Sequence, residues 1–153
     1  MTEDEARKAV VAEALSWVNT PYLEGARVKG AGVDCGQLLI QVYANVGLIE
    51  PFDTGYYSPQ HHMHSNEERY LNYVLERSTE VPEPELGGIV MFRFGRVYSH
   101  GGVVIGWPRI VHALRFAGTA IVNVDQCRLG PRALDKLPRK FFTLWPQGAE
   151  VRG

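Results

Sequence analysis

The sequence contains one stretch, VDCGQLLIQVYANVG (residues 33–47), that carries the signals of a complete helix. Asp34 is of the residue type that caps helix N-termini, and Gly47 is of the type that ends helices. The apolar residues between them recur at helical spacing, at Leu38, Leu39, Val42, Tyr43 and Val46. The pattern predicts a helix from Cys35 to Val46, with the cysteine in its first turn.

Cys35 is one of two cysteines, with Cys127, which is too few for a disulfide framework. The N–H groups of a first helical turn favour a thiolate by roughly 0.3–1 kcal/mol, and by about 2 kcal/mol at best. This lowers the pKa of a thiol by at most about 1.5 from its usual value of about 8.5, so much of it stays protonated at neutral pH. A cationic partner is needed to activate Cys35, and histidine is the usual one.

His100 and His112 are the candidates for that partner, because they fall on neighbouring predicted strands. A regular hairpin with an even loop centred on Trp107-Pro108 would point the two imidazoles to opposite faces of the sheet. An odd connection, or a bulge near residues 101–102, would make them diagonal neighbours on one face. We therefore predict one of these two irregularities.

The rest of the chain places helices before strands. Capping boxes at Thr2 with Glu5 and at Ser65 with Glu68 predict one helix that ends near residues 19–21 and another that runs to about residue 76. Residues 23–33, with their glycines, predict a loop, and residues 49–65 an irregular stretch. The predicted strands are residues 89–94, 101–106, 110–114, 120–124 and 141–145.

This order predicts a single α+β domain over residues 1–153, with N-terminal helices packed on one face of a mostly antiparallel sheet. The 153 residues are 45% hydrophobic and 22% charged, which excludes intrinsic disorder. The net charge of -1 argues against nucleic acid or anionic lipid as a partner. No apolar run reaches the roughly 18 residues that cross a bilayer, so membrane insertion is not expected. The acidic N-terminus lacks the features of a secretory signal, which predicts synthesis in the cytoplasm.

Three groups of residues resemble the NlpC-type family of papain-like cell-wall peptidases. They are WVNTPY (17–22) with VDCGQL (33–38), GIVMF (88–92), and SHGGVVIG (99–106) with VHA (111–113). The likeness runs from about residue 5 to residue 125. It is strongest to the short, leaderless branch found in phage tails and gene transfer agents.

The resemblance implies a papain-like cysteine peptidase that cuts peptidoglycan stem peptides, typically between D-γ-glutamate and a diamino acid such as meso-diaminopimelate. On that pattern Cys35 is the nucleophile, His100 is the general base, and His112 orients His100. Backbone N–H groups at the helix start, that of Cys35 first, would hold the oxyanion. No metal or other cofactor is implied.

The same resemblance implies supporting roles and partners. Tyr22 is the aromatic residue near the thiol, and Asp34 caps the helix beside it. Gly36 stands where many members have serine, so the substrate contact there is expected to differ. Tail-hub or tail-tip proteins are the expected partners, and a virion or tail particle that acts on the cell wall is the expected location.

The residues also allow other interpretations of the function. The same side chains suit a related cysteine- and histidine-dependent amidase or a thiol acyltransferase. Alternatively, the chain is a structural tail-tip component with an idle or masked site. Cys35, His100 and His112 could in principle bind zinc. The cluster of His61, His62 and His64 favours a solvated loop. The basic set of Arg128, Arg132, Lys136, Arg139 and Lys140 predicts a solvated face or a docking surface.

Overall fold

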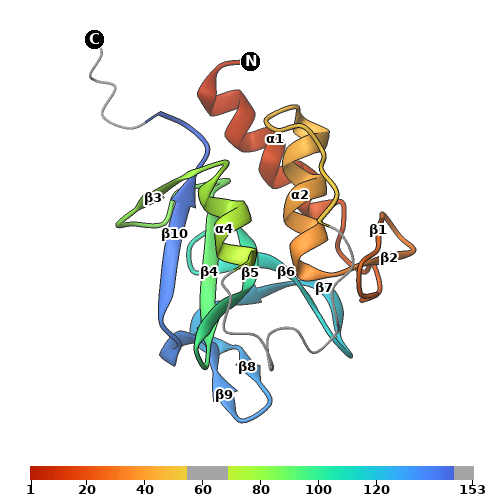
Figure 1. Ribbon diagram of the computed structural model, residues 1–153, viewed down its shortest axis with the longest axis vertical. Helices are drawn as coiled ribbons and strands as arrows, with labels where there is room; N and C mark the ends of the chain where they lie inside the picture. Colours follow the sequence, from red (N-terminus) through yellow and green to blue (C-terminus); the bar gives the residue numbers. More distant parts are fainter. Residues whose placement is uncertain (55–68, 147–153) are drawn as a thin grey trace.

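The computed structural model describes residues 1–54 and 69–146. Helices α1 (Glu3–Leu15) and α2 (Cys35–Val46) lie side by side against one face of a six-stranded sheet (Figure 1). A shorter helix, α4 (Arg69–Leu75), precedes the sheet. The expected α+β class, with N-terminal helices on a mostly antiparallel sheet, is confirmed.

The two long helices begin with the caps that the sequence predicts. In α1 the Thr2 side chain accepts a hydrogen bond from the Glu5 amide, and the Glu5 carboxylate accepts one from the Thr2 amide. In α2 the cap is Asp34, and Gly47 ends the helix with a left-handed φ of 89°. Both bounds of α2 agree with the prediction.

The end predicted for α1, near residues 19–21, is wrong, because the α-helix stops at Leu15. The chain keeps turning beyond it, but the amides of Trp17 and Val18 bond to carbonyls three residues back rather than four. Such tighter bonds are common where a helix ends. Asn19 then takes a positive φ of 76°, which turns the chain away before Pro21.

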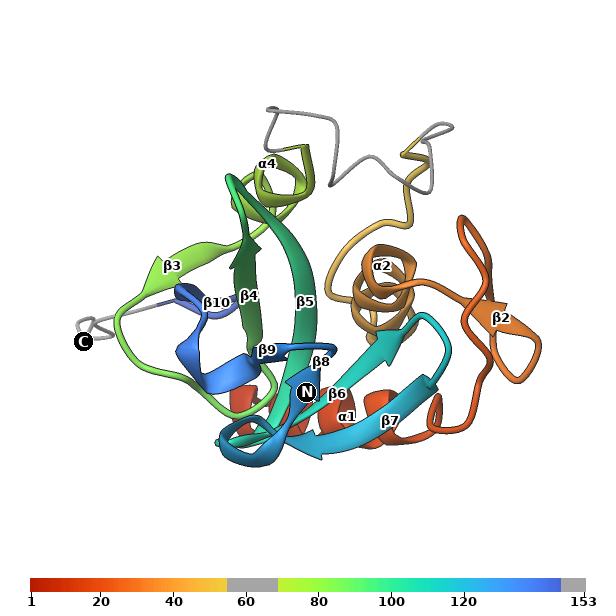
Figure 2. The ribbon, with the colours of Figure 1, turned by 90° about the horizontal axis from the view of Figure 1, so that it is seen from below.

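The six-stranded sheet has the order β3-β10-β4-β5-β6-β7, and all its pairs are antiparallel. Its strands are β3 (Thr79–Val81), β4 (Ile89–Phe94), β5 (Val97–Gly106), β6 (Arg109–Leu114), β7 (Gly118–Asn123) and β10 (Arg139–Thr143). The meander that the sequence predicts covers β4 to β7. The last strand instead returns across the sheet and pairs between β3 and β4, and β3 was not predicted. Figure 2 shows that the sheet is strongly twisted, with β6 and β7 running across the direction of β4 and β5.

Each face of the sheet has its own apolar cluster. On the helix face, Trp17 and Leu38 pack with Met91 and Val103. On the opposite face, Phe92 and Val104 pack with residues from the connection between β7 and β10, such as Leu134. That connection holds two 3-10 turns, η1 (Val124–Gln126) and η2 (Leu134–Lys136), around a small ribbon of β8 (Arg128–Leu129) and β9 (Arg132–Ala133). Figure 1 shows this ribbon beside the lower end of β4.

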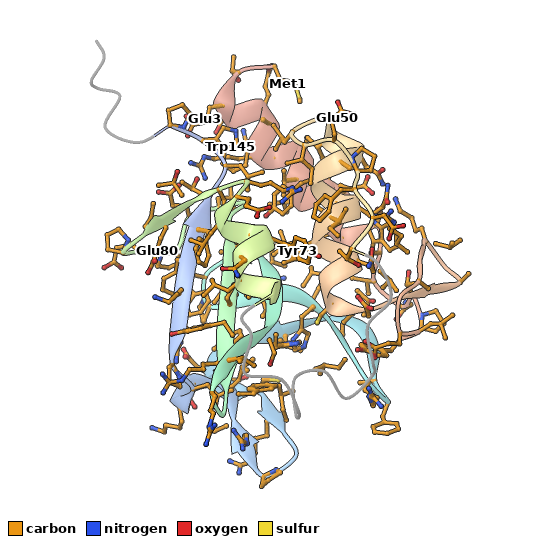
Figure 3. The ribbon with its side chains drawn as sticks, in the orientation of Figure 1. Met1, Glu3, Glu50, Tyr73, Glu80 and Trp145 are labelled. Carbon is orange, nitrogen blue, oxygen red and sulfur yellow. The ribbon has the colours of Figure 1, made fainter. Side chains whose placement is uncertain are left out.

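The segment that leads into β4 joins the helices to the sheet. Arg7 of α1 donates to the Leu86 carbonyl at 2.7 Å and pairs with Glu85 at 2.7 Å. Its guanidinium also lies 4.3 Å from the centroid of a Trp145 ring, and Figure 3 shows Trp145 beside the start of α1. Tyr43 of α2 donates its hydroxyl to the Gly87 carbonyl at 2.7 Å.

The residues before and after α2 form the right-hand side of the molecule in Figure 1. The predicted loop of residues 23–33 contains a short ribbon of β1 (Arg27–Val28) and β2 (Gly32–Val33). After α2, the Phe52 carbonyl accepts a hydrogen bond from Arg27 at 2.9 Å, and its ring packs against Tyr73 of α4. Figure 3 shows Tyr73 between α4 and α2. The predicted start of that helix at Ser65 lies outside the described residues.

The buried hydroxyl of Tyr43 allows a test of how α2 is fixed to the sheet. Tyr43→Phe leaves the Gly87 carbonyl without its donor, so we expect the free energy of unfolding to fall by about 1–3 kcal/mol. Urea unfolding of Tyr73→Phe is the comparison, because the Tyr73 hydroxyl makes a longer 3.3 Å bond in a half-buried position. Equal losses in the two variants would contradict the special role of Tyr43.

Candidate functional site

Cys35 is the first residue of α2, and a single carboxylate organises the chain around it. Asp34 is 2% exposed. One of its oxygens accepts a hydrogen bond from the Gln37 amide at 2.8 Å, and the other accepts one from the Gly25 amide at 2.6 Å. Asp34 therefore caps the helix, as predicted, and also holds the preceding loop. The two N–H donors also offset its negative charge, which would otherwise oppose a thiolate at Cys35.

The half-buried thiol of Cys35 faces β5. Its Sγ lies 3.8 Å from the carbonyl oxygen of Ser99, to which the S–H donates. Phe92 pairs with His100 and Arg93 pairs with Tyr98, so Ser99 is an extra residue in β5 relative to β4. This bulge turns the Ser99 carbonyl out of the regular ladder. The thiol is therefore placed against the residue that directly precedes His100.

His100 and His112 lie on one face of the sheet, as predicted from their strands. Nε2 of His100 is 2.9 Å from Nδ1 of His112. The predicted irregularity is present, but it is a bulge at Ile105 rather than near residues 101–102. Val104 pairs with Ile110 and Gly106 pairs with Arg109, which leaves Ile105 as the extra residue.

Gly102 makes room for this pair. A Cβ atom added there would lie 2.9 Å from the Val111 carbonyl oxygen and 3.3 Å from the Cβ of His112. Both contacts are shorter than ordinary van der Waals contacts. A side chain at this position would therefore displace β6 where it carries His112.

The ring of His100 is 5% exposed and packs against two phenylalanines of β4. The Phe94 ring is nearly parallel to it, with centroids 5.7 Å apart and an interplanar angle of 8°. The Phe92 ring lies at 6.2 Å. These contacts restrict the rotation of the imidazole, so the ring is held with Nε2 toward His112.

His112 is fully buried, and burial lowers its pKa to about 4. The imidazole is therefore neutral at physiological pH. Within the residues that the structure describes, its Nε2 has no hydrogen-bond partner, and the same is true of the buried Ser99 hydroxyl. The polar contact of His112 is thus directed toward His100.

Tyr22 belongs to the loop on the Cys35 side of the site, where it pairs with Val33 in an isolated bridge. Its hydroxyl donates to Glu24 at 3.3 Å, and Glu24 pairs with Arg115 at 3.2 Å. Burial raises the pKa of Tyr22, and the negative charges of Cys35, Glu24 and Asp34 raise it further. Burial and the charge of Asp34 also raise the pKa of Glu24.

The structure thus brings Cys35, Tyr22 and Asp34 to the α2 side of the site, and His100 with His112 to the β5–β6 side. Gly36, in the first turn of α2, is half-exposed. Cys127 is elsewhere, packed against the apolar cluster on the far face of the sheet, and burial raises the pKa of its thiol.

No set of three or more His, Cys, Asp or Glu side chains in residues 1–54 and 69–146 is placed to hold a metal ion. The cluster of His61, His62 and His64 lies outside the described residues. Among the helices that the structure describes, none combines the length and apolar character needed to cross a bilayer.

Four residues of the site were not assigned a role from the sequence. The alternation of Phe92 and Phe94 along a strand could have indicated two aromatic rings on the face of His100. Glu24, two residues after Tyr22, carried no local signal, because its contacts depend on how the loop and the β6–β7 hairpin meet. The role of the Ser99 carbonyl depends on a bulge that the residue pattern does not locate.

No protein-family model matches the sequence, and no curated protein matches it either. Solved structures do match, and their fold is that of NlpC/p60 domains. The chain therefore has the α+β, papain-like architecture of this class.

Three of these structures illustrate the likeness. The NlpC/p60 domain of the peptidoglycan hydrolase SagA is 18% identical, with a TM-score of 0.57 over 88% of this chain and 96% of that domain. The peptidoglycan hydrolase RipB of Mycobacterium tuberculosis is 18% identical, with a TM-score of 0.60 over 94% of this chain and 66% of that one. The P60 domain of an antigen from M. avium subspecies paratuberculosis is also 18% identical, with a TM-score of 0.59 over 92% and 96%. At 18% identity, the structural likeness establishes the fold alone.

The low pKa of His112 predicts how stability depends on pH. Above about pH 6.5 the imidazole is neutral in both the folded and the unfolded chain. As the pH falls from about 6.5 to about 4, the unfolded chain takes up a proton that buried His112 does not, so the folded state loses stability. We expect this loss to reach about 3 kcal/mol.

The measurement is urea unfolding of the wild type and of His112→Leu between pH 7 and pH 4. The difference in unfolding free energy between the two proteins should change over this interval, because the variant has no group to titrate. Parallel pH curves would show that His112 takes up its proton equally in the folded and unfolded states.

Proposed function

We propose that this chain is a cysteine peptidase that hydrolyses peptidoglycan stem peptides. The observation that carries the proposal is the arrangement of the thiol and the two imidazoles. Cys35 Sγ lies against the Ser99 carbonyl, and the next residue, His100, contacts His112 at 2.9 Å. The motifs that resemble the NlpC-type family and the fold shared with peptidoglycan hydrolases support the same conclusion.

In this mechanism His100 takes the proton of Cys35. Because Nε2 of His100 faces His112, Nδ1 is the ring nitrogen that exchanges a proton with the thiol. Neutral His112 then accepts a hydrogen bond at Nδ1 from the Nε2–H of His100 and keeps its own proton on Nε2. This bond favours the imidazolium form of His100 and adds no second positive charge, because the pKa of His112 is about 4.

The thiolate then attacks the carbonyl carbon of the scissile amide. The Gln37 amide is already bonded to Asp34, so the amides of Cys35 and Gly36 are the first-turn donors placed to receive the oxyanion. His100 gives its proton to the leaving amine as the C–N bond breaks. Water, deprotonated by His100, then hydrolyses the thioester and restores the thiol.

The bond we assign to this reaction is the amide between D-γ-glutamate and a diamino acid. Tyr22 and the ion pair of Glu24 with Arg115 at 3.2 Å lie on the Cys35 side, where the acyl part of the substrate would bind. The leaving diamino acid would then lie on the His100 side. This orientation follows from the mechanism, because the same imidazole must reach the leaving nitrogen.

The first test is hydrolysis of purified sacculi. Cys35→Ala removes the nucleophile, so we expect release of stem-peptide fragments to stop while the fold is retained, as judged by circular dichroism. Cys127→Ala is the matched control, because that thiol lies on the far face of the sheet and should be dispensable. Fragments released by the wild type should carry the termini of a cut γ-glutamyl bond in mass spectrometry.

Undiminished release by Cys35→Ala would refute the mechanism. If the released fragments carry the termini of a different amide bond, the thiol mechanism stands and the chain is assigned to the related amidases. Iodoacetamide could instead label Cys35 at a pH well below the usual pKa of a thiol while sacculi are not hydrolysed. This combination would favour a structural protein with a masked site.

We further propose that a phage-like tail carries this activity to the cell wall. The support is the likeness of the motifs to the branch of the family found in phage tails and gene transfer agents. Expression with candidate tail-hub proteins tests this directly. A complex that survives size-exclusion chromatography is expected, and separate elution from every hub protein would contradict it.

A further inference from the structure

Charge is distributed unevenly along this chain. Residues 1–54 contain eight acidic residues against four Lys or Arg, which gives this part a net charge of -4. Residues 86–146 contain nine Lys or Arg against two acidic residues, which gives the sheet half a net charge of +7. The net charge of the whole chain, -1, therefore does not describe the surface of the sheet half.

Many of the cations are neutralised within the fold. Lys29, for example, pairs with Glu13 at 2.9 Å, and Arg115 beside the site pairs with Glu24 at 3.2 Å. Others with a carboxylate partner are Arg7, Lys8, Arg77 and Lys140. The positive charge of these residues is largely spent on contacts inside the molecule.

Four exposed cations differ from this group, and we call them the basic end: Arg93, Arg128, Arg132 and Lys136. Within residues 1–54 and 69–146, no carboxylate lies within ion-pair distance of any of them. Three of them belong to the basic set for which the sequence allows either a solvated face or a docking surface. The structure adds Arg93, from the end of β4.

Backbone and ring contacts bring these four cations to one end of the molecule. The Arg93 amide donates to the Pro138 carbonyl at 2.9 Å, which joins β4 to the turn after Lys136. The Arg132 guanidinium lies 5.9 Å from the centroid of the Phe94 ring, and Arg128 is on the same ribbon of β8 and β9. Like charges held together repel one another, so this arrangement is unfavourable in the free protein and is relieved by a bound anion.

The basic end lies next to the β4–β5 side of the site. Phe94, which contacts Arg132, also stacks on His100 with ring centroids 5.7 Å apart. The acidic first turn of α1 is at the opposite end of the molecule, at the top of Figure 1, whereas the ribbon is at the bottom. An anionic polymer would therefore be attracted to the end that borders the site and repelled by the other end.

We infer that the basic end binds the anionic peptidoglycan meshwork at a place separate from the thiol site. This inference rests on the proposed function and adds a second, non-catalytic contact with the wall. Each stem peptide brings carboxylates, at its end and on the α-carbon of γ-linked glutamate, so a sacculus presents many anions in a repeated array. Each exposed ion pair is weak, but several formed at once hold the protein near its substrate.

Nucleic acid is the competing polyanion, and the charge distribution favours it less. Domains that bind nucleic acid are usually basic overall, whereas this chain has a net charge of -1. The excess of acidic residues in residues 1–54 would repel a second strand or a long duplex that passes the helices. A meshwork that contacts only one end of the molecule avoids this repulsion.

The experiment measures co-sedimentation of Cys35→Ala with purified sacculi, because this variant cannot digest them. The basic-end variant carries Arg93→Gln, Arg128→Gln, Arg132→Gln and Lys136→Gln in the same background. We expect it to bind sacculi about tenfold more weakly, as four exposed ion pairs allow. Raising NaCl from about 50 to about 200 mM should weaken binding of Cys35→Ala and have much less effect on the basic-end variant.

The matched control neutralises four cations that already have carboxylate partners: Lys8→Gln, Lys29→Gln, Arg77→Gln and Lys140→Gln. It changes the net charge equally and should bind sacculi as Cys35→Ala does. Circular dichroism checks that both variants are folded. With Cys35 intact, the basic-end substitutions should slow hydrolysis of sacculi and leave kcat/KM for a soluble stem tetrapeptide unchanged.

The outcomes separate this inference from the proposed function. If the wild type hydrolyses neither sacculi nor tetrapeptide but Cys35→Ala binds sacculi through the basic end, the binding surface stands and the hydrolytic function fails. If sacculi are cut and the basic-end variant binds them as tightly as Cys35→Ala, the surface is overturned and the peptidase stands. Salt-dependent binding of a short DNA duplex, without binding of sacculi, would also overturn it and assign the basic end to nucleic acid.

Discussion

The contact between His100 and His112 depends on the backbone register of two strands. Ile105 is the extra residue in β5, and it shifts the register so that both imidazoles lie on one face of the sheet. Gly102 then allows β6 to approach closely enough for the 2.9 Å contact. Without the bulge the imidazoles would face opposite ways, and His112 could not contact His100.

The thiol depends on a second irregularity in the same strand. The bulge at Ser99 presents a carbonyl to Cys35, while Asp34 fixes the first turn of α2 and the loop that precedes it. The two halves of the site are therefore held by backbone geometry rather than by long side chains. Such support suits the nucleophile and the base that we propose, because small displacements between reacting groups cost large factors in rate.

The parts of this structure that are encoded locally could be predicted from the sequence. The cap, the apolar spacing and the terminal glycine all lie within or beside α2, so both of its bounds are correct. Strand periodicity indicated that a regular hairpin would separate His100 and His112, so an irregularity was predicted to bring them to one face. The position of the bulge was not predicted, because any residue near the hairpin could have been the extra one. The placement of β10 between β3 and β4, and of Arg132 beside Phe94, depends on contacts between distant segments that no local pattern records.

The position of β10 also has a consequence for folding during synthesis. This strand lies between two strands that the ribosome makes at least 45 residues earlier, if the distance is counted roughly from Phe94 to Arg139. Until it emerges, β3 has no neighbour in the sheet and one edge of β4 is open to other chains. A nascent chain would thus keep this edge of β4 unpaired until Arg139–Thr143 have left the ribosome, and chaperones that shield unpaired strand edges could bind it during that interval.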